Sequence, residues 1–427
     1  MTTAEVHEDA AVPRARARRS PADEEVVIVG AGQAGLAVSH ELTRAGVAHV
    51  VLDRGRVGES WRGRWESFCA VTPNWYLSLP GRPYAGPDPD GFMPRDAIVA
   101  HLERYAEAFA APVRSGVEVT GLVRAPGTGF RLETSDGPIA ARAVVLGTGA
   151  FPRQHRPPAA ATLPAGVLRL DLAAYRDPGD LPAGAVLVVG SGQSGCQVAD
   201  ELLRAGRDVL LSCGRAPWAA RRVGGRDIVW WLHETGFLDA PLSSLPTPAA
   251  RLAANVQLTG AGVDRDLHYR TLRAEGVTLL GRFLGVEGRR ARFATDLAAS
   301  VAWGDERRGQ LMDLIRGLAA ERGLPAPEIP PPPPFAGDAP TEVDLRGVGT
   351  VVFTSGFRPD YSWVRIPGAL DELGFPVQRD GASTAAPGLF FIGVHFLRTR
   401  RSSSFAGAGE DAPVVARQIV ARHAARA

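Results

Sequence analysis

Apolar positions along the chain form short β-branched runs that alternate with stretches of helical spacing. Residues 25–30 (EVVIVG) are such a run, and residues 31–46 then repeat apolar positions at helical spacing, among them Leu36 and Leu42. Another apolar run, 48–53 (AHVVLD), follows directly. Strand, helix and strand in this order predict a βαβ unit with parallel strands.

The same pattern returns 160 positions further along the chain. The run 186–190 (VLVVG) leads into 191–206, which again has helical spacing, and the apolar run 208–212 follows. A chain of 427 residues is long enough for two domains. The sequence therefore predicts an α/β protein with two Rossmann-like dinucleotide-binding domains.

Later segments indicate how the two units are connected. The apolar runs that end at Gly149 and Gly356 are each followed by proline, as in segments that cross between domains. Near the C-terminus, an apolar strand at about 388–394 precedes a helix expected from about Asp411. Residues 305–323 read as a helix that could cover an active site, and the five prolines of 328–335 require an extended spacer. We expect the second unit to be inserted in the first. The expected divisions are a disordered tail (1–22), the first domain (23–165), the inserted domain (166–344) and a return segment of the first domain (345–427).

Three glycines at the first strand–helix turn have the spacing of a dinucleotide site. Gly30 permits a tight turn, Gly32 lets the backbone approach a pyrophosphate, and Gly35 lets the helix pack closely on the strand. The helix N-terminus then faces the phosphates with its free N–H groups. Asp53, 18 residues after Gly35, would accept hydrogen bonds from a ribose diol. The residues expected in this first site are Gly30, Gly32, Gln33, Ala34, Gly35, Asp53 and Arg54.

The second turn lacks the acid. Cys213 stands 160 positions after Asp53, and three arginines follow it. Without the carboxylate, a 2′-phosphate is not repelled, and a guanidinium can bind it, which favours NADPH; solvated surface arginines are the alternative. A bound FAD beside NADPH makes a working redox pair. The residues expected in this second site are Gly190, Gly192, Gln193, Ser194, Gly195, Arg215, Arg221 and Arg222.

Composition excludes several classes of partner. The net charge of +2 and the 45% hydrophobic content give no reason to expect nucleic acid or a membrane as partner. The three cysteines have no metal or redox spacing, which indicates a reducing cytoplasm. Because all basic residues are arginine or histidine, lysine-based chemistry is also excluded.

These motifs resemble the flavin-containing monooxygenases, the class B-like flavoproteins that include Baeyer–Villiger enzymes and plant indole-pyruvate monooxygenases. The resemblance runs from about Asp23 to the C-terminus. One departure lies between the domains, where the family has an aromatic-glycine-histidine-tyrosine pattern: Gly166 and Tyr175 are kept, but Asp171 takes the histidine position. The marks of the resemblance are the two glycine triplets, GESWRGRW (58–65), Thr148-Gly149 and Ser355-Gly356.

The resemblance implies roles for further residues. Trp61 would lie along the flavin, with core packing as the alternative, and Val119 would bind adenine through its backbone. Asn74 would sit near the flavin C4a atom and steady its oxygen adduct, with an Asx turn as the alternative. Thr148 and Gly149 would lie near the cofactors.

The implied function is that of an FAD-dependent, NADPH-reduced monooxygenase, which transfers one oxygen atom from a C4a-(hydro)peroxyflavin to a small organic substrate. An NADPH oxidase or dehydrogenase, and a flavin-binding redox sensor or transport accessory protein, are alternatives. A disulfide reductase is disfavoured because no two cysteines are close in sequence. Aromatic residues at 61–84, with Trp230 and Trp231, suit either a cavity for an apolar or aromatic substrate or the core. The roles of Arg398, Arg400 and Arg401 stay open, and structural roles are expected for His233 and His395.

Overall fold

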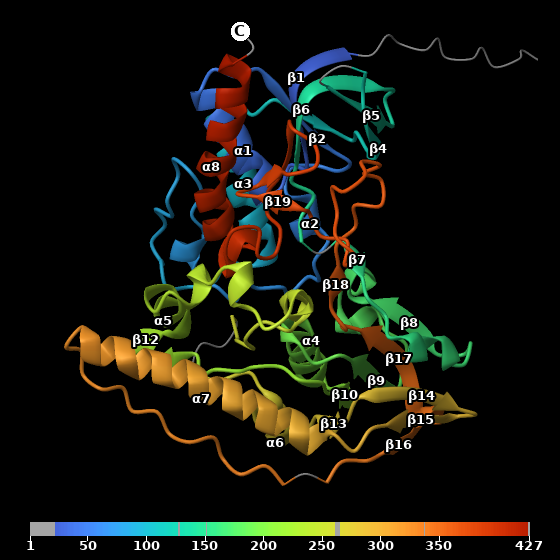
Figure 1. The fold of residues 1–427 in the computed structure, drawn as a ribbon. Helices are drawn as coiled ribbons and strands as arrows, with labels where there is room; N and C mark the ends of the chain where they lie inside the picture. The colour runs from blue at the N-terminus through green and yellow to red at the C-terminus, as the bar shows by residue number, and fades with distance from the viewer. Residues whose placement is uncertain (1–21, 127–128, 151, 261–264, 337, 426–427) are drawn as a thin grey trace, which may run out of the picture.

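Two α/β units build the protein, as a computed structural model shows (Figure 1). The structure describes residues 22–126, 129–150, 152–260, 265–336 and 338–425, so almost all of the expected N-terminal tail lies outside the described residues. The predicted fold class, with two Rossmann-like units, is confirmed.

The first unit is a nine-stranded sheet with helices α1 and α8 side by side (Figure 1). Its parallel strands run in the order β21-β6-β1-β2-β3. Val27 and Ile28 of the central strand are fully buried, because one packs toward α1 and α8 and the other toward the opposite face. The strands are β1 (Ala22–Val29), β2 (His49–Asp53), β3 (Val113–Ser115), β4 (Val119–Arg124), β5 (Phe130–Thr134), β6 (Ile139–Leu146), β19 (Gln378–Arg379), β20 (Ala382–Ser383) and β21 (Leu389–Phe391), and the helices are α1 (Gln33–Arg44), α2 (Glu59–Arg62), α3 (Arg95–Ala108) and α8 (Phe405–Ala424).

The second unit is a five-stranded parallel sheet in the order β13-β10-β9-β17-β8, flanked by a small antiparallel sheet of β14, β15 and β16. Its strands are β8 (Leu168–Asp171), β9 (Ala185–Val189), β10 (Val209–Ser212), β13 (Thr278–Leu280), β14 (Phe283–Glu287), β15 (Arg290–Phe293), β16 (Glu342–Asp344) and β17 (Val348–Phe353). A separate hairpin is formed by β11 (Arg222–Val223) and β12 (Arg226–Asp227), and the helices are α4 (Gln193–Arg204), α5 (Ile228–Glu234), α6 (Tyr269–Ala274) and α7 (Leu297–Glu321).

The two chain crossings between the units pair with each other. β7 (Arg153–Gln154) and β18 (Phe357–Arg358) form a short antiparallel ladder. β17 lies between β8 and β9, so the inserted unit extends to Phe353 and does not end at the expected residue 344. Ala160 likewise packs in the core of the inserted unit, before the expected start at residue 166. An apolar run predicts a strand but not the sheet that it joins, which explains both differences.

Two helices differ from their predicted bounds. α8 begins at Phe405 rather than near Asp411, because the Ser404 hydroxyl caps it by accepting a hydrogen bond from the Gly407 N–H at 3.1 Å. α7 begins at Leu297 and packs through Leu311 on the cluster around α5, on the side of the inserted unit away from α1 and α8 (Figure 1). No helix in the described part of the chain is long and apolar enough to cross a membrane.

Candidate functional site

The first glycine turn is closed toward the protein and open toward solvent. Gly30 has φ +110°, and a Cβ there would lie 2.4 Å from the Gly147 carbonyl oxygen. A Cβ on Gly35 would lie 1.9 Å from the Gly30 carbonyl oxygen, whereas one on Gly32 would meet nothing within 4 Å. The turn therefore leaves space at Gly32, at the N-terminus of α1, where a pyrophosphate fits.

Asp53 braces this turn. One carboxylate oxygen accepts a hydrogen bond from the Ala31 N–H at 2.7 Å and the other from the Gly55 N–H at 2.8 Å. The Asp53 carbonyl accepts from the Val117 N–H at 2.9 Å, which brings the start of β4 at Val119 to the same sheet edge. Arg54, exposed beside Asp53, lies at this edge too. A ribose diol and an adenine bound at this edge would contact Asp53, Arg54 and Val119, the residues that the sequence predicts.

The second glycine turn has the same shape. Gly190 has φ +108°, and a Cβ on Gly195 would lie 2.0 Å from the Gly190 carbonyl oxygen. A Cβ on Gly192 would meet only the Ala254 Cβ, at 3.7 Å. The side chain of Gln193 exchanges two hydrogen bonds with the backbone of Leu258, so it anchors a loop beside the turn.

A hydroxyl replaces the carboxylate in the second unit. Ser191 stands where the first unit has Ala31, and its hydroxyl accepts a hydrogen bond from the Gly214 N–H at 2.8 Å. Tyr269 lies 2.6 Å from the same hydroxyl and also donates to the Gly214 carbonyl at 2.7 Å. Cys213 is buried at the position of the acid, and burial raises the pKa of its thiol. The turn is thus held without a negative charge near a 2′-phosphate.

The three arginines after Cys213 occupy different environments. Arg215 and Arg222 are exposed, and Arg215 has no hydrogen-bond or ion-pair partner within the described residues. Arg221 is only 2% exposed, and its guanidinium pairs with Asp227, with Nε–Oδ2 at 2.9 Å. Arg221 also donates to the carbonyls of Val71 and Thr259. The interpretation of Arg221 as a phosphate ligand is therefore wrong, because its donors are used inside the protein.

We expect Arg221→Met to lower the free energy of unfolding by about 3–5 kcal/mol, because it leaves the buried Asp227 carboxylate without its cation. Thermal or urea denaturation measures the change. The matched control is Arg222→Met on the exposed neighbour, with an expected change near zero. Equal destabilisation of both variants would contradict the buried pair.

Trp61 connects the starts of two helices in the first unit. Its indole N–H donates to the side-chain oxygen of Gln33 at 3.1 Å, and its ring lies 5.5 Å from that of Phe405. Trp61 is half-buried and packs partly on the core, so both of its predicted roles are compatible with this position.

Asn74 lies in a 3-10 turn (Asn74–Leu77) that packs against α8. It is 6% exposed, and its amide donates to the Asp88 carbonyl at 2.8 Å. Its Oδ1 atom is buried without a hydrogen-bond partner in the part of the chain that is described. The Thr148 hydroxyl, at the first crossing, is likewise buried without a hydrogen-bond partner among the described residues. Buried polar atoms of this kind call for a partner from a bound molecule or water.

The positions of several other candidates are structural. Trp231 lies in the core cluster of α5 and α7, which agrees with the core alternative for this residue. His395 lies 3.1 Å from the Ser403 hydroxyl, and burial lowers its pKa to about 4. His233 lies 3.0 Å from a guanidinium nitrogen of Arg401.

Sequence reasoning missed the residues that hold the second turn from the side. Thr354, at the second crossing, donates to the Gly190 carbonyl at 2.6 Å. Ser191 and Tyr269 brace Gly214, as described above. Only Ser191 carried a signal in the sequence, because it replaces Ala31 where the acid is also lost.

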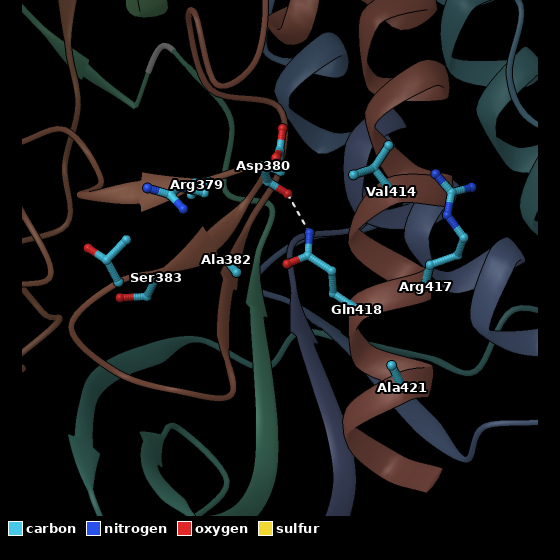
Figure 2. A pocket seen from close by; sticks show the side chains of 9 residues that line it. Arg379, Asp380, Ala382, Ser383, Val414, Arg417, Gln418 and Ala421 are labelled. Atoms are coloured by element: carbon cyan, nitrogen blue, oxygen red, sulfur yellow. Dashed lines mark hydrogen bonds between the residues drawn. The ribbon is translucent and has the colours of Figure 1, made fainter. Parts of the chain in front are cut away.

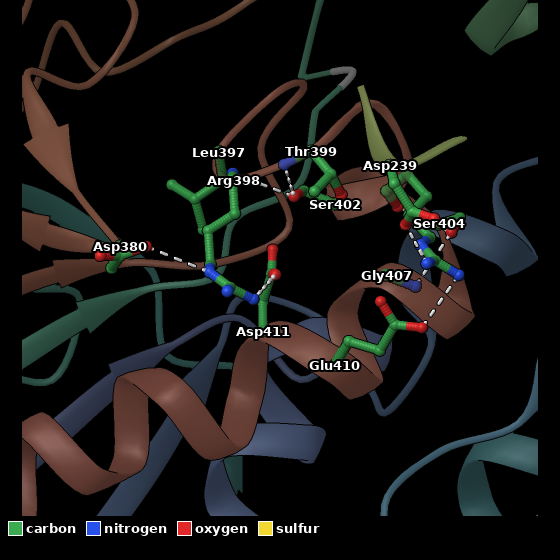
Figure 3. Close-up of polar contacts among 12 residues, drawn as sticks. Asp239, Asp380, Leu397, Arg398, Thr399, Ser402, Ser404, Gly407, Glu410 and Asp411 are labelled. Carbon is green, nitrogen blue, oxygen red and sulfur yellow. Dashed lines mark hydrogen bonds and ion pairs between the residues drawn. The ribbon is translucent and has the colours of Figure 1, made fainter. Parts of the chain in front are cut away.

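Ion pairs fix the loop before α8 (Figure 3). Arg398 pairs with Asp411 at 3.1 Å and with Asp380 at 3.2 Å. Arg401 pairs with Glu410 at 3.0 Å and with Asp239 of the inserted unit. The Arg401 cluster therefore links the two units at the N-terminal end of α8.

A shallow groove lies elsewhere, between the β19–β20 hairpin and the C-terminal half of α8 (Figure 2). Its volume is about 490 Å³, and Gln418 crosses it to donate to the Asp380 carbonyl at 2.8 Å. None of the residues predicted to bind a cofactor lines this groove.

Comparisons with known proteins agree with this geometry. The family model described as pyridine nucleotide-disulphide oxidoreductase matches residues 27–233. An uncharacterized CzcO-like oxidoreductase of Geobacillus kaustophilus is 29% identical over 398 residues, which are 93% of this chain and 98% of the relative. The indole-3-pyruvate monooxygenase YUCCA4 of rice is 41% identical over 85 residues, 19% of each protein. The flavin-containing monooxygenase of Stenotrophomonas maltophilia shares the fold, with a TM-score of 0.67 and 21% identity over 94% of this chain and 99% of that one.

The chain is thus similar to flavin-containing monooxygenases, in fold over nearly its whole length and in sequence over shorter segments. The chain is an oxidoreductase, and its cofactors are FAD and NADPH, as predicted. The residues present fit both groups: the open space at Gly32 and the Asp53 carboxylate suit FAD, and the uncharged edge at Cys213 suits NADPH. The individual binding residues stay predictions.

Proposed function

We propose that the chain is an FAD-dependent, NADPH-reduced monooxygenase that transfers one oxygen atom from O₂ to a small organic substrate, by sulfur or nitrogen oxygenation or by carbonyl oxygen insertion. The proposal rests on one observation. The two glycine turns have the same shape, but the strand end beside the first holds Asp53 and the strand end beside the second holds Cys213. Bound FAD supplies the chemistry, because it accepts hydride from NADPH and activates oxygen.

The protein's own residues would orient the cofactors and exclude water. Asp53 would accept hydrogen bonds from the FAD ribose, and Arg215 would pair with the 2′-phosphate of NADPH. Asn74 has a second amide N–H beyond the one that bonds the Asp88 carbonyl, and no described residue bonds its Oδ1, so this amide would hold a polar group of the reacting centre in place.

The cysteines support this function over disulfide reduction. Cys196 and Cys213 are buried in the core of the inserted unit, and burial raises the pKa of both thiols. Cys69, in the first unit, is a free thiol that donates to the Phe92 carbonyl. Thiols held protonated in a core are poor redox nucleophiles. Free cysteines also support the expected cytoplasmic location.

The relatives support oxygen transfer, since the rice relative and the Stenotrophomonas neighbour are both named monooxygenases. An NADPH oxidase is the second candidate, because the same cofactor pair releases hydrogen peroxide when the oxygen-activating step is not protected. The test must therefore separate protected from unprotected oxygen chemistry.

Stopped-flow absorbance makes this separation. The FAD-loaded protein is reduced anaerobically with NADPH and mixed with oxygenated buffer. We expect a spectral species distinct from both reduced and oxidised FAD that persists for seconds. Immediate return to oxidised FAD with stoichiometric hydrogen peroxide would instead support the oxidase.

We expect Asn74→Ala to shorten the lifetime of this species by roughly ten-fold, the effect of losing one hydrogen bond of about 1.4 kcal/mol. FAD content should stay unchanged, because Asn74 is not part of the glycine turn. The control is Ser78→Ala at the end of the same 3-10 turn, where the hydroxyl bonds only local backbone. Equal lifetimes in Asn74→Ala and the unmodified protein would assign Asn74 a turn-forming role alone.

A further inference from the structure

Three arginines lie close together in the loop before α8, and one of them differs from the other two. Arg398 and Arg401 each pair with two carboxylates. The guanidinium of Arg400 has neither an ion pair nor a hydrogen bond to any described residue, and its Nε atom is buried. Two members of this arginine cluster are therefore structural, whereas the Arg400 charge has no acid partner in the described part of the chain.

Aromatic rings hold the Arg400 guanidinium. Its central carbon lies 4.3 Å from the ring centroid of Phe237 and 5.2 Å from that of Phe396. Its backbone N–H donates to the Ala240 carbonyl at 2.9 Å. Stacking on aromatic faces orients a guanidinium while leaving its in-plane N–H donors free. Arg400 is thus positioned before any ligand arrives.

Arg400 lies between the two units. Phe237 and Ala240 belong to the inserted unit, whereas Phe396 follows the last strand of the first unit. Ser404, the cap of α8, is only four residues further along the chain. Phe396 has φ +52°, a conformation that costs free energy in a residue other than glycine, so the surrounding structure holds its ring in this place.

An unpaired guanidinium shielded by two rings favours a planar anion. A carboxylate would accept two parallel hydrogen bonds from the free N–H groups, and the reduced exposure to water would strengthen them. Partial burial of this cation without an acid lowers the pKa of Arg400, and an incoming anion would relieve that cost. The two phenylalanine rings would meet an apolar or aromatic body attached to the carboxylate.

We propose that Arg400 binds the carboxylate of the substrate, and that the substrates are small organic acids with an apolar or aromatic body. That the bound acid is a substrate rests on the proposed function. Anion binding at Arg400 is separate from oxygen transfer and can be measured without it.

Isothermal titration of the FAD-loaded protein, without NADPH, tests the proposal with phenylacetate and its neutral counterpart phenylacetamide. We expect phenylacetate to bind at least ten-fold more tightly, Arg400→Gln to remove this preference, and Arg400→Lys to restore part of it. The control, Arg417→Gln, changes an exposed arginine in the C-terminal half of α8 and should keep the preference. FAD content and the KM for NADPH should be unchanged in Arg400→Gln.

Other outcomes would overturn the proposal. They are equal binding of acid and amide, no binding of phenylacetate, an unchanged preference in Arg400→Gln, or a rise in the KM for NADPH in that variant. The last would assign Arg400 to the nicotinamide cofactor. Because the titration contains no reductant and measures binding alone, failure of the monooxygenase reaction would leave this result intact.

Discussion

Gly35→Ala should yield protein without FAD, whereas Gly195→Ala should yield FAD-loaded protein that NADPH no longer reduces. A Cβ on Gly35 would lie 1.9 Å from the Gly30 carbonyl oxygen, and one on Gly195 would lie 2.0 Å from the Gly190 carbonyl oxygen. Backbone cannot yield at such distances without moving the helix. The displaced helix N-terminus then no longer faces the phosphates, and we expect a loss of affinity of roughly 100-fold or more, about 2.7 kcal/mol.

The two variants control each other because they change the same atom in like turns of different units. The ratio of flavin to protein absorbance measures FAD content, and anaerobic titration with NADPH measures reduction. Gly317→Ala, in α7, serves as an inert control because its Cβ would meet nothing within 4 Å. If Gly195→Ala lost FAD and Gly35→Ala kept it, the assignment of the two sites would be reversed.

The glycine turns could be predicted because their chemistry is local. Gly30 and Gly35 are needed by the path of ten consecutive residues, so their spacing alone indicates strand, turn and helix. Asp53 follows the same logic, since it ends the next strand. The fold class and the two dinucleotide cofactors follow mainly from the two glycine turns and the strand ends beside them.

Features that depend on distant segments could not be predicted. Arg221 carries the same sequence signal as Arg215, but Val71 and Thr259 come from elsewhere in the chain to bury it. β17 lies in the segment 345–427, which was expected to return to the first domain, but it joins the sheet of the second unit. Arg400 differs from Arg398 only because acids approach one and not the other.

Ser191 shows how the second turn keeps its shape after losing the acid. In the first unit the Asp53 carboxylate accepts from the Ala31 and Gly55 N–H groups and so joins turn and strand end. In the second unit a neutral hydroxyl at Ser191 accepts from the Gly214 N–H and makes the same connection. The negative charge is therefore removed without loosening the turn, which is what a ligand with an added phosphate requires.

We expect Arg215→Gln to raise the KM for NADPH by roughly 10- to 100-fold while leaving the KM for NADH unchanged, because a charge-assisted bond to the 2′-phosphate is worth about 1.5–3 kcal/mol. Arg215 is exposed beside the uncharged edge at Cys213 and has no competing acid in the described chain. Steady-state reduction of FAD with either coenzyme measures both constants.

Arg222→Gln is the matched comparison. Arg222 donates to the Gly225 carbonyl, at 3.5 Å, within the β11–β12 hairpin, so a smaller effect is expected there. A larger rise in the KM for NADPH in Arg222→Gln than in Arg215→Gln would assign the 2′-phosphate site to the hairpin instead of the strand end. Equal rises in the KM for NADPH and NADH in Arg215→Gln would mean that the residue supports the fold of the site and does not read the phosphate.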